Sequence, residues 1–192
     1  MLRLNRMRFF STAVLIILGA YLCSAQKFEV LSGSKMEIHG SSNVNQFTCI
    51  YPTQEIKPLE INFNTDQMLF RKAEIHLPVA TFDCGGHGIN RDFKDLLQEK
   101  EHPEVKINLK KLNLISSTEA MVSLNLEIAG IKNNYRLPVK YQKKNNYFTA
   151  SATLPLNIDD FELEQPRRLF GLIVVHKEID IIFDLRFKAS SD

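Results

Sequence analysis

The sequence predicts an all-β protein, built as an antiparallel sandwich or closed barrel of about eight strands with one short helix. Three observations predict this class. Apolar and polar residues alternate with a period of two along most of the chain, which is the pattern of strands with one buried face. Short links rich in Asn and Ser separate these runs, and such links join antiparallel neighbours. A single segment carries the spacing of a helix.

The chain has 192 residues, and residues 1–25 have the pattern of a cleavable export signal. A basic start precedes the apolar run 9–22, which is shorter than the roughly 20 residues of a spanning helix. The run ends in Cys23-Ser24-Ala25, with small residues where a signal peptidase cuts. A lipoprotein is disfavoured because Leu22 is larger than the residue expected before a lipidated cysteine, and an uncleaved anchor is a further alternative. We therefore expect a periplasmic or secreted product, residues 26–192, that folds as one domain.

The basic character of the chain belongs to this signal. Removing it takes away three of the 24 Lys and Arg residues and none of the 22 Asp and Glu residues, so the net charge changes from +2 to −1. The remainder carries no electrostatic signature of nucleic-acid binding. A composition with 24% charged and 44% hydrophobic residues excludes collagen-like, coiled-coil and wholly disordered chains.

The predicted strands follow one another with few interruptions. In chain order they are 35–39, 61–63, 73–77, 105–110, 122–128, 137–141, 148–156 and 179–187. Since Asn tolerates a positive φ, Asn133-Asn134 and Asn145-Asn146 are expected to be hairpin turns, as is Ser116-Ser117-Thr118. Strands with one apolar face must bury it together, and closure into a barrel also removes exposed edges.

The predicted helix follows a glycine-rich segment. Phe93, Leu96 and Leu97 have the i, i+3, i+4 spacing of one helix face. Asn90 or Asp92 could cap its start. His102-Pro103 stops it, because a residue before proline avoids the α conformation.

Two cysteines, Cys49 and Cys84, remain after removal of the signal. An even pair in an exported protein indicates a disulfide. The closed loop of about 36 residues would stabilise the fold by about 3–4 kcal/mol. The alternative is two buried free thiols.

Five segments carry a resemblance to a known family. They are residues 40–47 (GSSNVNQF), residues 73–79 (AEIHLPV), Asp92-Phe93 with Leu96-Leu97 and His102-Pro103-Glu104-Val105, residues 124–131 (LNLEIAGI), and Asp160-Phe161 with the final alternating strand. In this order they resemble the YceI-like family, the lipocalin-like polyisoprenoid-binding proteins of bacterial envelopes, over roughly residues 30–187. The chain departs from many members at Lys132, where they carry Thr, and at Glu162, where they carry Gly.

The resemblance implies an eight-stranded antiparallel lipocalin-like barrel with one short helix as a lid. It implies a carrier, without catalysis or cofactor, whose interior holds an isoprenoid or another long-chain amphiphilic lipid. An eight-stranded barrel is just wide enough for one slim ligand, and each buried CH₂ contributes about 0.8 kcal/mol. The expected partner is therefore a lipid rather than a nucleic acid; transient membrane contact and the oligomeric state are left open.

The candidate ligand-binding residues face inward in these runs or lie on the helix. They are Phe47, Phe63, Ile75, Leu77, Phe93, Leu96, Leu97, Ile107, Leu124, Leu126, Phe148, Ala150, Phe183 and Leu185. Arg167 and Arg168 are candidates for binding a pyrophosphate or carboxylate head group at the barrel mouth. The alternative is that the apolar residues simply pack as core, which would make the protein an interaction module with a filled barrel.

Motifs for catalysis are incomplete. Ser32-x-x-Lys35 matches penicillin-recognising enzymes, but the KTG and SDN partners of that motif are absent. Cys84 and His87 are too few for a zinc site, and no GKS or GKT follows the glycines as in a phosphate loop. Glu99, Glu101 and Glu104 fit a solvated helix end. The sequence therefore predicts no metal site, and an enzyme using Cys84 and His87 is a third hypothesis.

Overall fold

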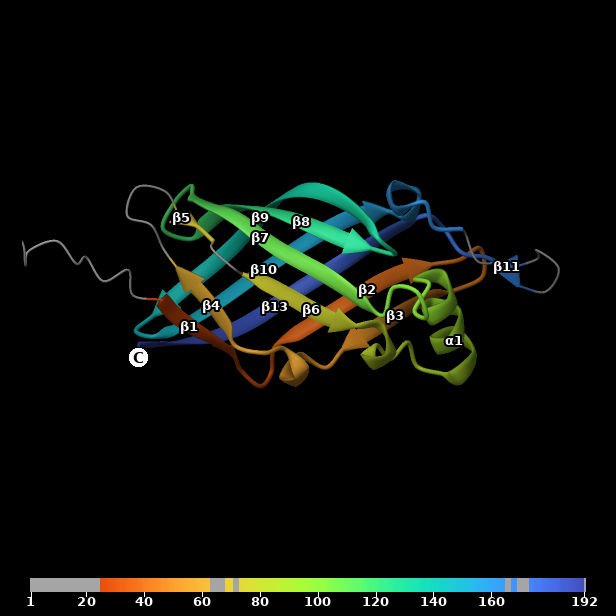
Figure 1. The fold of residues 1–192 in the computed structure, drawn as a ribbon, viewed down its shortest axis with the longest axis horizontal. Helices are drawn as coiled ribbons and strands as arrows, with labels where there is room; N and C mark the ends of the chain where they lie inside the picture. Colours follow the sequence, from red (N-terminus) through yellow and green to blue (C-terminus); the bar gives the residue numbers. More distant parts are fainter. Residues whose placement is uncertain (1–24, 63–67, 71–72, 165–166, 169–172, 192) are drawn as a thin grey trace, which may run out of the picture.

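The computed structural model describes residues 25–62, 68–70, 73–164, 167–168 and 173–191. It is a strongly curled antiparallel sheet, a half-barrel, with one short helix at one end (Figure 1). This confirms the expected all-β class, the antiparallel strand order and the single helix. The expected export signal falls on residues 1–24 and Ala25, and all but Ala25 lie outside the described residues, as does Phe63.

The elements have the following bounds. The 11-stranded sheet contains β1 (Ala25–Val30), β2 (Lys35–Ser41), β3 (Gln46–Tyr51), β4 (Leu59–Asn62), β5 (Met68–Leu69), β6 (Glu74–Pro78), β7 (Glu104–Leu114), β8 (Glu119–Ile128), β9 (Ile131–Lys144), β10 (Tyr147–Asn157) and β13 (Glu178–Ser191). A separate ribbon pairs β11 (Arg167–Arg168) with β12 (Ile173–Val174). The helices are α1 (His87–Leu96) and the 3₁₀ turns η1 (Thr53–Glu55), η2 (Val79–Thr81) and η3 (Ile158–Phe161).

The strands occupy eight positions in the order β3-β2-β13-β10-β9-β8-β7-β5. Strands β1 and β2 share the position beside β13, because residues 180–184 of β13 pair with β2 and residues 187–191 pair with β1. Strand β4 pairs with β1, as β3 pairs with β2, and β5 and β6 both pair with β7. The predicted eight-stranded arrangement is therefore present, with some positions divided between two short strands.

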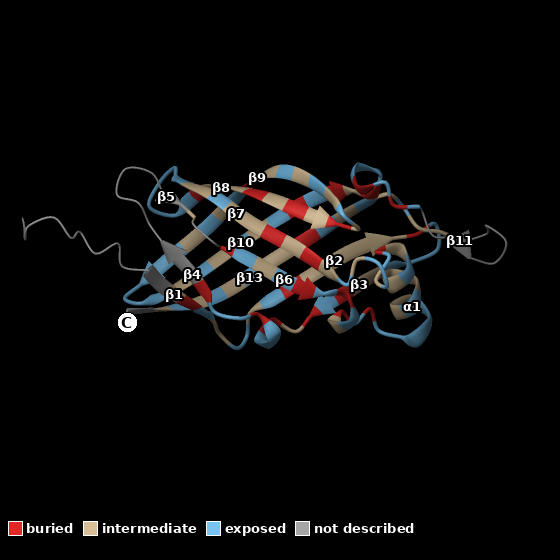
Figure 2. Cartoon of the chain, in the orientation of Figure 1, coloured by how far each residue is buried: buried red, intermediate tan, exposed pale blue. Residues whose placement is uncertain are grey.

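The period of two in the sequence becomes the inner and outer face of this sheet. In the β10–β13 ladder, Leu154 pairs with Ile181, and Ala152 pairs with Phe183. These residues are buried or half-buried, whereas their neighbours Ser151 and Thr153 are exposed. The same alternation follows the other long strands (Figure 2). The core consequently lies inside the curl.

The β8–β9 turn is not where the asparagines predicted it. It lies at Ala129 and Gly130, which take φ values of 48° and 79°. Two successive positive φ values give a two-residue turn that matches the twist of paired strands. Asn133 and Asn134 instead lie inside β9 and pair with β8. The expected turn at Asn145 is confirmed, with φ at 55°.

Helix α1 begins earlier than expected. It starts at His87, and its N-cap residue is Gly86, which has no side chain to cap the helix. Asn90 does not cap the helix, because its Oδ1 accepts from the Cys84 N–H at 2.6 Å and its Nδ2 donates to Asp83 Oδ1 at 3.0 Å. The side chain thus fixes the loop before the helix. In the described ranges, no helix has the length and apolarity needed to cross a membrane.

The two edges of the curled sheet meet between β3 and the segment after β6. Ile50 and Asp83 exchange main-chain hydrogen bonds of 2.8 and 3.0 Å. Beside this bridge, Cys49 and Cys84 form the expected disulfide, with their Cα atoms 3.9 Å apart. In the part that the structure describes, no continuous ladder joins β3 to β6, since the chain leaves β6 through η2. The expected closed barrel is therefore a half-barrel whose edges are linked at this point.

Candidate ligand-binding cavity

An apolar cavity lies inside the curled sheet at the end where α1 packs. The space open to the centres of water-sized molecules is about 80 Å³. Its walls come from strand inner faces, from α1 and from η3. The lining residues are Met36, Ile38, Phe47, Leu77, Phe82, Phe93, Leu96, Leu97, Val105, Ile107, Leu124, Leu126, Ile128, Leu154, Leu156, Asn157, Ile158, Phe161, Leu163, Val175, His176, Ile179, Ile181 and Phe183.

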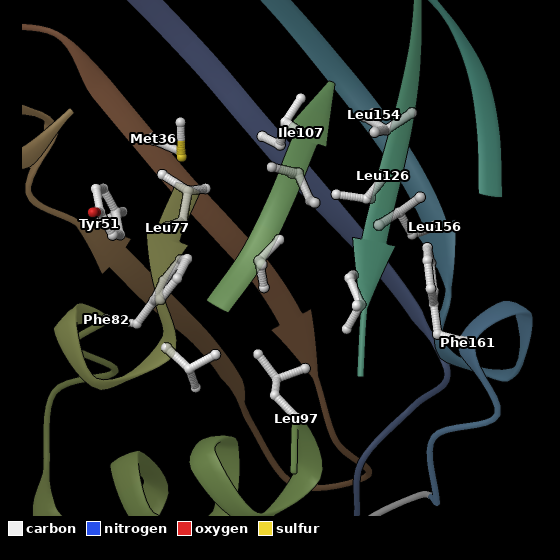
Figure 3. Close-up of a cluster of buried hydrophobic side chains, with 14 of the residues drawn as sticks. Met36, Tyr51, Leu77, Phe82, Leu97, Ile107, Leu126, Leu154, Leu156 and Phe161 are labelled. Carbon is white, nitrogen blue, oxygen red and sulfur yellow. The ribbon is translucent and has the colours of Figure 1, made fainter. Parts of the chain in front are cut away.

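The strand register explains how these walls form. Ile181 of β13 pairs with Leu154 of β10 on one side and with Ile38 of β2 on the other. Ile107 of β7 pairs with Leu126 of β8 on the opposite wall. Side chains on alternating positions of neighbouring strands thus meet on one face. Figure 3 shows Ile107, Leu126 and Leu154 among the buried side chains that gather inside the sheet.

Helix α1 packs at one end of the sheet, and its apolar side chains contribute to the cavity wall. Phe93 lines the cavity, and its ring centroid lies 5.2 Å from that of Phe82. The Phe82 ring in turn lies 5.0 Å from that of Tyr51 in β3. Burial, with a smaller effect from Glu55, raises the pKa of the Tyr51 phenol. This row of aromatic rings connects the helix to the same strand that holds the disulfide.

The β2–β3 hairpin brings Phe47 into the cavity wall. Gly40 pairs with Phe47, and a Cβ added at Gly40 would overlap the Phe47 ring. The ring can therefore lie across the neighbouring strand because residue 40 has no side chain. The turn itself is held by Ser42, whose Oγ donates to Asn45 Oδ1 at 2.7 Å and accepts from the Val44 N–H. The GSSNVNQF segment is thus a hydrogen-bonded turn beside an aromatic wall.

Asn157 and His176 are polar residues among those that line the cavity, and the hydrogen bond from the Ile158 N–H to the Lys177 carbonyl, at 3.0 Å, brings their backbones near each other. His176 Nδ1 lies 3.0 Å from Ser41 Oγ, and Asn157 Oδ1 accepts from the Asp159 N–H at 2.9 Å. Val175 and His176 directly follow β12, whose partner β11 contains Arg167 and Arg168. The arginine pair is thereby tied through the backbone to the cavity, although the two side chains themselves lie outside the described part.

This fold and its segment order match a known family. Residues 27–187 match the model of the YceI-like domain. The chain belongs to the YceI-like domain family. No curated protein matches the chain at a significant level.

Solved structures share the fold of this YceI-like domain at low sequence identity. Burkholderia cenocepacia BcnA is 19% identical, with a TM-score of 0.66 over 82% of this chain and 99% of that chain. A polyisoprenoid binding domain from Saccharophagus degradans, implicated in plant cell wall breakdown, is 15% identical, with a TM-score of 0.66 over 87% of this chain and 99% of that chain. A Campylobacter jejuni YceI protein is 14% identical, with a TM-score of 0.55 over 79% of this chain and 85% of that chain. At these identities the likeness shows the fold alone.

The YceI-like domain brings a large part of the predicted ligand set together. Phe47, Leu77, Phe93, Leu96, Leu97, Ile107, Leu124, Leu126 and Phe183 all line the cavity. Ile75, Phe148, Ala150 and Leu185 do not line it, and lie farther along the same strands. Contact of any of these side chains with a ligand stays a prediction.

The sequence reasoning missed several lining residues. Met36, Ile38, Val105, Leu154, Leu156, Ile179 and Ile181 lie on runs whose alternation was recognised, so the same signal could have included them. Val175, His176 and the residues of η3 follow no periodicity. Their place depends on main-chain contacts such as the hydrogen bond from the His176 N–H to the Ser41 carbonyl, at 2.8 Å. No feature of the local sequence predicts that hydrogen bond.

Charged groups lie outside the cavity on the outer face of the sheet. Lys106 Nζ donates to Glu127 Oε1 at 2.8 Å, and Lys132 Nζ lies 3.3 Å from Glu127 Oε2. The Lys106 hydrogen bond, with a smaller contribution from Lys132, lowers the pKa of the Glu127 carboxyl. Among the described residues, no cluster of His, Cys, Asp and Glu could hold a metal ion. Cys84 lies in the disulfide, so it cannot pair with His87 as a thiolate.

Proposed function

We propose that this protein is a non-catalytic carrier that binds an isoprenoid or a similar amphiphilic lipid in the α1-end cavity. The observation that carries the proposal is an almost wholly apolar cavity inside a one-sided β-sheet. Such a site can hold an apolar tail and leave a polar head near water.

The physical basis is burial of the tail. Each CH₂ transferred from water into an apolar cavity contributes about 0.8 kcal/mol, and no hydrogen-bonding code is needed. The described walls offer aliphatic and aromatic side chains such as Leu126, Ile107 and Phe93, and Ser41, whose hydroxyl lies 3.0 Å from His176 Nδ1, is not among the lining residues. A lipid held there is carried and is not converted.

We propose that the head group lies at the end of the cavity near His176 and Asn157. The β11–β12 ribbon, which contains Arg167 and Arg168, ends directly before Val175 and His176 in the chain. Guanidinium groups bind phosphate and carboxylate oxygens in a bidentate manner. An anionic head, such as a pyrophosphate, therefore suits this end of the cavity.

Membership of the YceI-like family supports the proposal, as does the fold shared with a domain described as polyisoprenoid binding. We further propose that the protein acts in the periplasm or outside the cell. The signal-like pattern of residues 1–25 supports this location. The Cys49–Cys84 disulfide also supports it, because disulfides persist in oxidising compartments.

A cavity-filling variant tests the proposal. Leu124 lines the cavity, whereas Asn125 is the next residue of β8 and lies on the opposite face. Leu124→Phe should reduce farnesyl pyrophosphate binding by at least about tenfold, and Asn125→Phe should leave it unchanged, as measured by isothermal titration calorimetry. Equal binding by both folded variants would show that the lipid binds elsewhere. No binding by the unsubstituted protein would favour the alternative, an interaction module with a filled barrel.

A further inference from the structure

The interior of the half-barrel holds two apolar clusters along its length, and Ile75 and Leu109 pack against both. One surrounds the cavity. The other, here called the distal cluster, has Phe28, Leu59 and Ala73 buried at its centre, with Phe70, Ile75, Leu109, Phe148, Phe187 and Ala189 packed against them. None of these residues lines the cavity. Among the residues that the structure describes, the apolar interior therefore continues beyond the cavity as packed side chains.

The order of residues on single strands shows where the cavity ends. On β13, Ile179, Ile181 and Phe183 line it, whereas Phe187 belongs to the distal cluster. On β10, Leu156 and Leu154 line it, whereas Phe148 belongs to the distal cluster. Phe183 pairs with Met36 of β2, which is also a lining residue. The inner end of the cavity thus lies at the level of the Phe183–Met36 pair.

Aromatic rings from three strands pack together beyond this level. Phe148 of β10 pairs directly with Phe187 of β13. The Phe148 ring also meets the Phe28 ring of β1 edge to face, with centroids 5.7 Å apart. Lys143 Nζ lies 5.4 Å from the centroid of the Phe148 ring. Phe148, itself half-buried, therefore joins these rings into a floor, with a cation above its ring.

We infer that this floor limits the ligand to a single short tail, of the length of a few isoprene units, and excludes a long polyprenyl chain. From Ile179 to Phe183 the strand advances about 14 Å, and the depth along the axis is smaller because barrel strands are tilted. The cavity volume of about 80 Å³ is also small. This inference rests on the proposed function and narrows its substrate class.

Two substitutions on the inner face of β10 move the floor in opposite directions. Phe148→Ala removes the central ring and opens the distal half. Ala152→Leu adds a side chain opposite Phe183, at the inner end of the cavity. The control is Thr149→Ala, because Thr149 neighbours Phe148 on the outer face and is exposed.

The experiment measures dissociation constants of geraniol, farnesol and solanesol by displacement of a fluorescent apolar probe. Because the chain has 0 Trp, its own emission interferes little. We expect the unsubstituted protein to bind farnesol at least about tenfold more tightly than solanesol. Phe148→Ala should bring the two affinities within about threefold, Ala152→Leu should shift the preference to geraniol, and Thr149→Ala should change nothing.

The outcomes separate this inference from the proposed function. If the affinity of the unsubstituted protein rises steadily from geraniol to solanesol, the inferred limit on tail length is wrong, and the carrier proposal is unaffected. An unchanged chain-length profile in folded Phe148→Ala leads to the same conclusion. If Phe148→Ala does not fold, the Ala152→Leu profile decides. Absence of binding by all three alcohols and by the corresponding pyrophosphates overturns the carrier proposal itself.

Discussion

Cys49 of β3 is bonded to Cys84 ahead of α1, directly beside the main-chain bridge between Ile50 and Asp83. The covalent bond therefore crosses the line where the two edges of the curled sheet meet. Asp83 is also held by its neighbours, because the Asn90 amide and the Gly85 N–H donate to its carboxylate and lower its pKa. This arrangement fixes the start of α1, and with it the helix face that closes the cavity.

Removing the disulfide should destabilise the protein substantially. The two cysteines are 35 residues apart, and opening such a loop in the unfolded chain costs about 3–4 kcal/mol of stability. Cys49→Ala with Cys84→Ala should therefore lower the free energy of unfolding by that amount in urea titrations. The unsubstituted protein in reductant should show the same loss, as a control. An unchanged urea midpoint in the double variant contradicts this account.

The β8–β9 turn should not tolerate a side chain at Gly130. Its φ is +79°, and an added Cβ would lie 2.7 Å from the His102 ring. Since the left-handed conformation alone costs about 1–2 kcal/mol, Gly130→Ala should lose at least that much in thermal unfolding. Gly88→Ala is the matched control, because a Cβ there meets nothing within 4 Å and the site lies in α1. A Gly130→Ala melting temperature equal to that of the control would refute the assigned turn.

The Glu127 ion pairs should contribute stability that disappears in acid. The pKa of Glu127 is lowered in the folded state from its ordinary value of 4.5, so the folded protein holds this proton less tightly than the unfolded chain. The ion pairs therefore contribute their full stability above about pH 4.5. This contribution is lost as the pH falls through the lowered pKa of the folded state. Glu127→Gln should lower the melting temperature by about 1–3 °C at pH 7 and by nothing in strong acid. A difference that persists at low pH would assign the effect to packing.

The arginine pair of β11 should matter for charged head groups and not for neutral ones. Arg167→Ala with Arg168→Ala should weaken farnesyl pyrophosphate binding by about tenfold or more, the effect of losing one charge-assisted hydrogen bond. Farnesol binding serves as the internal control and should stay unchanged, because the tail site is intact. Equal losses for both ligands would mean that the β11–β12 ribbon supports the cavity instead of binding the head.

The sequence predicted the class, the strand order and the helix face, because period-two alternation and i, i+3, i+4 spacing report directly on burial. The Ile179–Phe187 alternation is one example, since it became the inner face of β13. Residue-level features set by distant contacts were harder to predict. Asn133-Asn134 had the composition of a turn, but Gly130 adopts a positive φ at lower cost and took that place.

In the candidate site, too, features set by local periodicity could be predicted and those set by distant contacts could not. Leu124 and Leu126 could be assigned to an inner face from their spacing, and both line the cavity. Phe148 has the same spacing, yet it lies in the distal cluster, because periodicity fixes the face of a strand and not the position along the barrel axis. His176 was missed because its place depends on the ribbon that follows η3. The position of a residue along the barrel axis, and the residues at the end of the cavity, could not be predicted from the local sequence pattern.

Native mass spectrometry of the protein purified from its own source without detergent tests the central claim most directly. The account predicts a discrete added mass that denaturation releases into organic extract, with the mass of a short prenyl amphiphile. The denatured protein should also lack two hydrogens, because Cys49 and Cys84 are bonded. An unliganded mass that stays unchanged after incubation with prenols, prenyl pyrophosphates and fatty acids would contradict the carrier function.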